Sequence, residues 1–303
     1  MIIENNPICL FTYNRLEETK KTIEALKKNY LAVVSELFVF SDGWKNDEGK
    51  TRVLELRSYL KTIDGFKNII IYESSVNKGL ANSIIEGVTK VLNTYDKVIV
   101  IEDDLITSPN FLNYMNQALT VYENREDIIS VSGHSLKFKL PNNYNSDVYL
   151  FGRAGSWGWG TWKKKWKMID WEINDFEFFK KDFKSQKKFN KNGSDMSSML
   201  KGYFEGKNNS WAIRFCYNQF KLNMYSVFPV LSKVNNVGFG DEATNCKGYD
   251  RFKIDFDTSN KVNFKLPLDI SSNKKIIKQI VSYLSLSSRL KSKILTKYYT
   301  YFR

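Results

Sequence analysis

The first hundred residues alternate between short apolar runs and longer segments in which apolar positions recur every three or four residues. Apolar runs bounded by turn residues are typical of buried strands, and the longer spacing is typical of amphipathic helices. The pattern predicts strands at residues 7–13, 36–41, 68–72 and 97–101, and helices at residues 16–29, 51–60 and 80–92.

Regular alternation of strand and helix predicts an α/β fold, with a mostly parallel sheet and helices on its faces. The predicted strands are almost entirely apolar, as expected when both faces of a sheet are covered. Ligands of such sheets bind beyond the carboxyl ends of the strands. Three of the four predicted ends carry acids, so we expect the chemistry there; the ends are residues 12–15, 41–43, 73–74 and 102–104.

The pattern becomes less regular after residue 104. It predicts a helix at 108–122, a strand at 128–132 and a further strand-and-helix block at 211–236, with a charged helical or loop segment at 172–200. No internal repeat is visible, and no linker divides the chain before about residue 267. We therefore expect one domain over residues 1–267 and a separate tail over residues 268–303.

The tail concentrates positive charge in a chain whose formal net charge is +13. Residues 271–303 contain eight Lys or Arg and no acid, interleaved with aliphatic side chains. This pattern predicts an amphipathic helix over residues 274–297, which either lies on an anionic membrane or packs on the domain. Elsewhere the basic residues are dispersed and no nucleic-acid-binding motif is recognised, so we expect no nucleic-acid partner.

Cysteine usage and hydropathy bear on location. The three cysteines, Cys9, Cys216 and Cys246, are far apart and odd in number, which disfavours a disulfide framework and fits a reducing compartment. The N-terminus lacks the features of a signal peptide, and no apolar stretch approaches the ~18 residues that span a bilayer. We expect a cytoplasmic protein that is peripheral on the inner membrane face through its tail.

The most specific chemical signal is the acidic triplet Glu102-Asp103-Asp104, directly after a predicted buried strand. Three adjacent acids repel one another unless a cation is present. Carboxylate oxygens suit Mg²⁺ or Mn²⁺, which commonly share their coordination with substrate phosphates. The alternative is an acidic turn that helps to cap the helix beginning at Ser108-Pro109.

These motifs together resemble the nucleotide-binding half of GT-A glycosyltransferases. The acidic triplet is most similar to that of the animal N-acetylglucosaminyltransferase I family and of related bacterial polysaccharide glycosyltransferases. The resemblance covers residues 7–246 in patches, carried by PICLFTYNR, LFVFSDG, NKGLANSIIEG, VIVIEDD, FGRAGSWGWGTWKKKW, NNSWAIRF and SKVNNVGFGDEATNC. It implies a GT-A, Rossmann-like domain with a nucleotide-binding half at residues 1–106, an acceptor half at residues 107–267 and a helical C-terminal extension.

The resemblance also implies an activity. A hexosyl or N-acetylhexosaminyl group would move from a nucleotide-sugar donor, UDP rather than GDP, to a hydroxyl of a glycan or lipid-linked glycan in bacterial surface polysaccharide biosynthesis. By position, Asp104 would coordinate the metal, Mn²⁺ or Mg²⁺. Asp103 and Glu102 would contact the ribose or the waters of the metal, and Asp42 would read the uracil base.

Four further residues match positions beside the nucleotide. Thr12 and Arg15 would line the nucleotide and its diphosphate, and Lys78 and Asn82 would lie beside it. Three of them have a plainer interpretation that the sequence leaves open: Arg15 as a surface charge at a helix start, Lys78 as a solvated loop residue and Asn82 as a helix cap. Asp42 likewise fits an Asx-type turn before a glycine.

A segment rich in tryptophan and glycine, residues 148–171, is the second signal. In the family this segment lines the donor sugar and the acceptor site. Indole rings offer flat faces to sugars, and glycine lets the backbone approach a ligand. We expect substrate contacts from the residues Arg153, Trp157, Trp159 and Trp211. We assign Trp162 and Trp166 to the core.

The general base is not evident. An inverting transferase needs one, usually Asp or Glu, and the family carries a carboxylate just before the tryptophan that matches Trp211. This chain has Asn208-Asn209-Ser210 there, so the nearest candidates are Asp241 and Glu242, unless these are loop acids and the enzyme retains configuration.

Two other positions bear on the acceptor site. Related sequences end the loop at residues 236–246 with a histidine, and this chain has Asn245. We interpret His134 as a hydrogen-bonded structural residue rather than an acceptor contact.

Two other functions fit parts of the pattern. A nucleotidyltransferase would carry a glycine-rich phosphate loop after the first strand, and residues 12–15 contain no glycine. A non-catalytic sugar-binding module would not need three acids after a strand. Both are less consistent with the sequence than glycosyl transfer.

Overall fold

The apolar runs near the N-terminus form four adjacent parallel strands, as the sequence predicts. The structure is a computed structural model that describes residues 5–237 and 253–301. Strand β1 lies between β2 and β4, with Ile8 opposite Leu37 on one side and Ile99 on the other. The four strands are β1 (Ile8–Thr12), β2 (Glu36–Ser41), β3 (Asn68–Glu73) and β4 (Lys97–Glu102).

The same sheet continues into the second half of the chain. Within the described residues it has eight strands in the order β3-β2-β1-β4-β8-β6-β9-β7. Strand β8 runs antiparallel to both β4 and β6, β9 is parallel to β6, and β7 closes the edge antiparallel to β9. These strands are β6 (Ile128–Ser132), β7 (Val148–Phe151), β8 (Trp159–Trp162) and β9 (Tyr225–Pro229).

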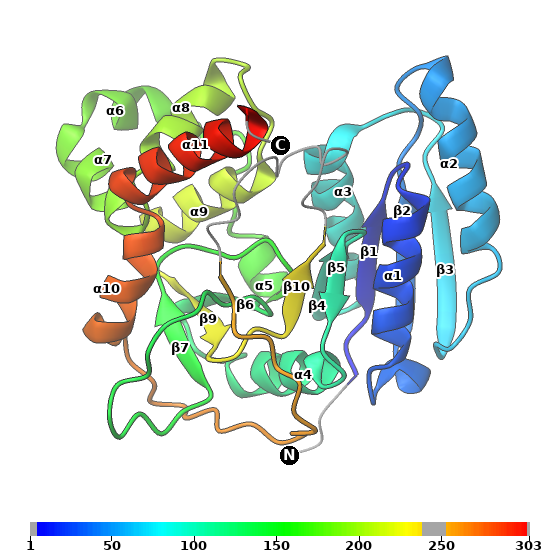
Figure 1. Ribbon diagram of the computed structural model, residues 1–303, viewed down its shortest axis with the longest axis horizontal. Coiled ribbons are helices and arrows are strands. Elements are labelled where there is room, and N and C mark those ends of the chain that lie inside the picture. The colour runs from blue at the N-terminus through cyan, green and yellow to red at the C-terminus, as the bar shows by residue number, and fades with distance from the viewer. Residues whose placement is uncertain (1–4, 238–252, 302–303) are drawn as a thin grey trace.

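Helices cover both faces of the sheet (Figure 1). Alternate residues of β1 point to opposite faces. Ile8 and Leu10 belong to a core shared with α1, α2 and α4, whereas Cys9 and Phe11 belong to a core shared with α3 and α9. The predicted α/β class, a mostly parallel Rossmann-like sheet flanked by helices, is confirmed. The helices are α1 (Leu16–Lys27), α2 (Asp47–Leu60), α3 (Gly79–Thr94), α4 (Phe111–Val121), α5 (Lys163–Trp166) and α9 (Trp211–Lys221), with the 3₁₀ turn η1 (Ala32–Val34).

The charged segment after residue 171 forms a small helical layer. Its apolar residues, among them Phe189 and Leu200, pack with Ile213 and Tyr217 of α9 into a separate hydrophobic cluster. The layer therefore rests on the main domain through α9. Its elements are α6 (Phe176–Lys181), α7 (Phe183–Phe189), η2 (Asn190–Asn192) and α8 (Met196–Phe204).

A short two-stranded ribbon follows the acidic triplet. β5 (Leu105–Thr107) pairs antiparallel with β10 (Val234–Asn236). The sequence pattern misses β5 because three residues are too few to show a period. The helix predicted from residue 108 accordingly begins at Phe111. The ribbon brings residues just before position 238 next to the acids, since the Val237 N–H donates to the Asp104 carbonyl at 2.9 Å.

The tail forms two helices rather than the single predicted one. α10 (Lys274–Tyr283) lies beside β7 (Figure 1) and buries Ile276 and Ile280 against Tyr149, Phe151 and Phe228. After a turn at residues 284–285, α11 (Leu286–Tyr301) crosses the helical layer. No helix in the described part of the chain is both long enough and apolar enough to cross a bilayer.

Candidate functional site at the strand ends

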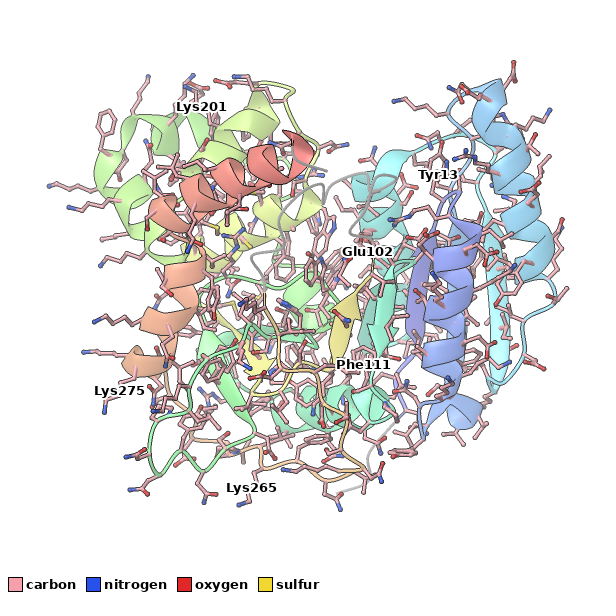
Figure 2. All side chains as sticks on the ribbon, viewed as in Figure 1. Tyr13, Glu102, Phe111, Lys201, Lys265 and Lys275 are labelled. Carbon is pink, nitrogen blue, oxygen red and sulfur yellow. The ribbon has the colours of Figure 1, made fainter. Side chains whose placement is uncertain are left out.

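A cavity of about 240 Å³ lies at the carboxyl ends of β1, β2 and β4. Figure 2 shows Tyr13 and Glu102 at this end of the sheet. Six of the residues that the sequence analysis selected line this cavity: Thr12, Arg15, Asp42, Glu102, Asp103 and Asp104. The Thr12 hydroxyl oxygen is buried and has no hydrogen-bond partner among the described residues, so it is available to a ligand.

Arg15 joins the two aspartates of the triplet. Its guanidinium forms an ion pair with Asp103 and a second with Asp104, at 3.2 Å between Nη1 and Oδ2. The other Asp103 oxygen accepts the Tyr13 N–H at 3.4 Å. One cation thus bridges two acids and fixes the loop after β1 against the end of β4.

The remaining negative charge of the triplet is poorly compensated. Burial, together with the charges of Asp104 and Asp103, raises the pKa of Glu102 to about 8. Burial also raises the pKa of Asp103 to about 6, although Arg15 opposes this shift. An additional cation near these groups would therefore be stabilised by them.

A metal could be held here with help from a substrate. In the described part of the chain, no three His, Cys, Asp or Glu side chains are grouped so as to hold a metal by themselves. Mg²⁺ sites that also take substrate phosphates need only one or two carboxylates. Asp104, whose side chain is more exposed than that of Asp103, fits such a site.

Asp42 holds a loop in place. Its Oδ1 accepts the N–H groups of Gly43 and Lys78, both at 2.9 Å. Its Oδ2 accepts the Gly79 N–H at 2.9 Å and the Asn77 side-chain amide at 3.1 Å. Because four donors occupy this carboxylate, it would read a base only by exchanging one of these bonds.

Lys78 and Asn82 do not line the cavity. The Lys78 ammonium forms an ion pair with Glu86 at 2.5 Å, on the outer side of α3. The Asn82 amide donates to the Lys78 carbonyl at 3.1 Å, within the first turn of the helix. Asn82 thus caps no N–H group of α3, and the roles of Lys78 and Asn82 beside the nucleotide stay predictions.

Sequence reasoning missed several residues that line the cavity. Lys45 adds a second cation beside Arg15, and Asn77 and Ser83 add polar side chains. The signal for Lys45 was available, because it follows the Asp42-Gly43 turn by two positions. Asn77 and Ser83 lie within the quoted segment NKGLANSIIEG, of which the resemblance assigns roles only to Lys78 and Asn82.

The structure places two of the predicted substrate contacts in the hydrophobic core. Trp159 and Trp211 are only 1% and 4% exposed. The Trp159 ring stacks on Trp211 at 4.8 Å and on Trp166 at 5.8 Å between ring centres. Trp159 is core because β8 is an interior strand, and Trp211 of α9 is core because it stacks on Trp159. The assignment of Trp162 and Trp166 to the core is confirmed.

The other two predicted contacts, Arg153 and Trp157, line a second cavity together with His134. The His134 Nε2 atom is buried and has no hydrogen-bond partner among the described residues, contrary to a hydrogen-bonded structural ring. Asp241, Glu242 and Asn245 lie outside the described residues, so their roles stay predictions.

Comparisons with known proteins add little to this description. No protein-family profile matches the chain, and no curated protein sequence matches it. Among solved structures, it is similar to the mannosyltransferase PcManGT from Pyrobaculum calidifontis in complex with GDP-Man and Mn²⁺, with 12% identity and a TM-score of 0.36 over 53% of this chain and 45% of that one. It is also similar to S. aureus TarS, with 10% identity and a TM-score of 0.31 over 46% of this chain and 24% of that one. The matched region spans less than half of either solved structure. The function of this chain is therefore inferred from its own residues.

Proposed function

We propose that this chain is a GT-A glycosyltransferase that uses a nucleotide-sugar donor with Mn²⁺ or Mg²⁺. The observation that carries the proposal is the arrangement around Arg15, where acids and cations from β1, β2 and β4 meet at one cavity. A diphosphate needs such cations, and a metal that accompanies it needs a carboxylate. The nucleotide-binding half would be residues 1–106 and the acceptor half residues 107–267.

The residues have distinct roles in this proposal. Asp104 would hold the metal, which supplies positive charge to the departing diphosphate. Arg15 and Lys45 would bind the same phosphates, and the unpaired Thr12 hydroxyl would bind the nucleotide. Arg15 must then exchange a carboxylate for a phosphate, which its bidentate geometry permits.

The finer points are also proposals. Resemblance favours a UDP-sugar, either hexosyl or N-acetylhexosaminyl, and a glycan or lipid-linked glycan as acceptor in surface polysaccharide biosynthesis. The acceptor hydroxyl must lose its proton, and Asp241 and Glu242 remain the proposed bases. Asp42 would contribute to base recognition through the loop that it organises.

Nucleotide binding provides a direct test. In isothermal titration, UDP is expected to bind at least about tenfold more tightly with Mn²⁺ than with EDTA, because Asp104 and the diphosphate then share the metal. GDP serves as the comparison for base preference. Binding that is equal with and without Mn²⁺ would favour a metal-independent sugar-nucleotide-binding module instead.

The second helix of the tail suits a membrane surface. Leu286, Leu290 and Ile294 recur every four residues on one face of α11 and are 64%, 52% and 67% exposed. Arg289 and Lys291 lie between them in the sequence, and residues 271–303 contain no acid. We propose that this face of α11 lies on an anionic membrane. α10 does not take part with its apolar face, because that face is buried on the domain.

Replacing Leu286, Leu290 and Ile294 together with serine is expected to weaken sedimentation with phosphatidylglycerol vesicles by at least about tenfold. A matched control replaces three exposed leucines outside α11 with serine, namely Leu54, Leu231 and Leu268. Equal sedimentation of the two variants would exclude α11 as the membrane contact.

A further inference from the structure

The second cavity lies between the sheet edge and the C-terminal helices, and we name it the His134 cavity. It measures about 300 Å³, which is enough for a small ligand. Its walls come from β7, β9 and the end of β6, from α9, and from α10 with the turn after it. α10 therefore completes a binding-sized space as well as covering the sheet edge.

Most of the lining is apolar. The apolar side chains come from β7, β9 and α10 and from the segments that follow β6 and α10, and they include Leu136, Tyr149, Phe151, Phe228, Ile280 and Leu284. Apolar walls favour a ligand with an aliphatic or aromatic part. A purely hydrophilic ligand such as a free oligosaccharide would leave these walls poorly matched.

The imidazole of His134 presents an unpaired polar atom in the cavity lining. His134 packs edge-on against Trp157, with 4.6 Å between the ring centres, and its buried Nε2 has no partner among the described residues. Burial lowers the pKa of His134 to about 3, so the ring is neutral near pH 7. A neutral imidazole nitrogen can exchange a hydrogen bond with a ligand hydroxyl.

Positive charge is in excess at one side of the cavity. Arg153 forms an ion pair with Asp195 at 2.9 Å, and Arg289 of α11 reaches the same carboxylate at 3.5 Å. Two guanidinium groups thus share one acid. The cluster of Arg153, Arg289 and Asp195 therefore has a net positive charge, and Arg153 is its member that lines the cavity, which favours an anionic group on the ligand.

The cavity is linked to the candidate donor site through the backbone. The Gly133 carbonyl, next to His134, accepts the Lys233 N–H at 2.7 Å. Lys233 leads into β10, which pairs with β5 directly after Asp104. A ligand that extends from the His134 cavity along this ribbon approaches the end of β4.

We infer that the His134 cavity binds an amphipathic anion. Its apolar part would fill the walls, a hydroxyl would meet His134 Nε2, and a phosphate-like group would lie near Arg153. If the proposed function holds, this ligand is the acceptor, a glycan joined to an apolar carrier through a phosphate. The binding site itself stands on the cavity, the unpaired nitrogen and the shared acid, independently of glycosyl transfer.

The test uses the full-length protein and a fluorescent apolar sulfonate, 1-anilinonaphthalene-8-sulfonate, displaced by decyl phosphate. Ala212 lines the cavity from α9, so Ala212→Trp is expected to weaken displacement by at least about tenfold. Ser58→Trp adds the same side chain at an exposed position of α2 outside the cavity and is expected to have no effect. Circular dichroism melting verifies that both variants are folded.

A second variant tests the charge. Arg153→Gln is expected to weaken decyl phosphate binding while leaving decyl glucoside, which is neutral, nearly unchanged. Absence of saturable binding to the wild type, or equal displacement from Ala212→Trp and wild type, would overturn the inference. Equal losses for both ligands in Arg153→Gln would overturn the anionic part.

The two proposals fail separately. Probe binding needs neither donor nor metal, so a variant of Asp104 is expected to bind decyl phosphate normally even when it transfers no sugar. Normal probe binding in a protein that never hydrolyses a nucleotide sugar would leave the cavity as a site of another function. Full transfer activity without any probe binding would remove only the His134 cavity.

Discussion

Replacing Asp104 with asparagine is expected to reduce Mn²⁺-dependent hydrolysis of the donor by about a hundredfold or more, corresponding to about 2.7 kcal/mol of transition-state stabilisation. Asparagine keeps the size of the side chain and removes the charge that would hold the metal. The measurement is release of nucleoside diphosphate from a panel of UDP- and GDP-sugars, with Mn²⁺ and with EDTA. The panel also identifies the donor.

A matched control separates this effect from a general loss of an acid. Asp64→Asn makes the same change in an exposed loop residue. Asp64 forms an ion pair with Lys27, and neither residue lines the cavity. It is expected to hydrolyse the donor at the wild-type rate. If Asp104→Asn and Asp64→Asn are equally active, Asp104 has no part in the reaction and the proposed metal site is wrong.

The strands and helices of residues 1–106 were predictable because their signals are local. An apolar run of five or six residues specifies a buried strand, and its polar end specifies the rim. The turn Asp42-Gly43 illustrates this, since a Cβ on Gly43 would lie 2.4 Å from the Val76 carbonyl carbon and only glycine fits. The acids at residues 102–104 come to the cavity for the same reason, because they follow a strand that pairs with β1.

The second half was less predictable because its strand order is not local. β8 inserts between β4 and β6, so residues 159–162 are covered on both faces. The neighbouring glycines suggested exposure to a ligand, but Gly160 serves packing. A Cβ there would lie 2.8 Å from the Val98 carbonyl oxygen and 3.1 Å from both Leu119 and Met115.

The tail shows a similar limit. A continuous amphipathic pattern over residues 274–297 predicts one helix but cannot tell which apolar positions find a protein surface. Ile276 and Ile280 pack on Tyr149, Phe151 and Phe228 of β7 and β9, whereas Leu286, Leu290 and Ile294 of α11 stay exposed. Only the tertiary arrangement separates a packed segment from a candidate membrane contact.

The contrast between two tryptophans gives the largest expected effect on stability. Trp159→Ala is expected to lower the free energy of unfolding by about 3–5 kcal/mol, because it removes a fully buried indole stacked between Trp166 and Trp211. Urea titration followed by circular dichroism measures this change. Trp157→Ala, at a partly exposed position that lines the His134 cavity, is expected to cost less than about 1.5 kcal/mol.

For ligand binding the expected order of the same two variants is reversed: Trp157→Ala has the larger effect and Trp159→Ala the smaller. In the absence of urea, and at a temperature where both variants are folded, Trp157→Ala is expected to weaken decyl phosphate binding several-fold, since the indole forms part of the cavity wall. Trp159 does not line the cavity, so its truncation should alter this binding little. A stable Trp159→Ala protein with impaired substrate binding would restore Trp159 as a ligand contact and contradict the packing around β8.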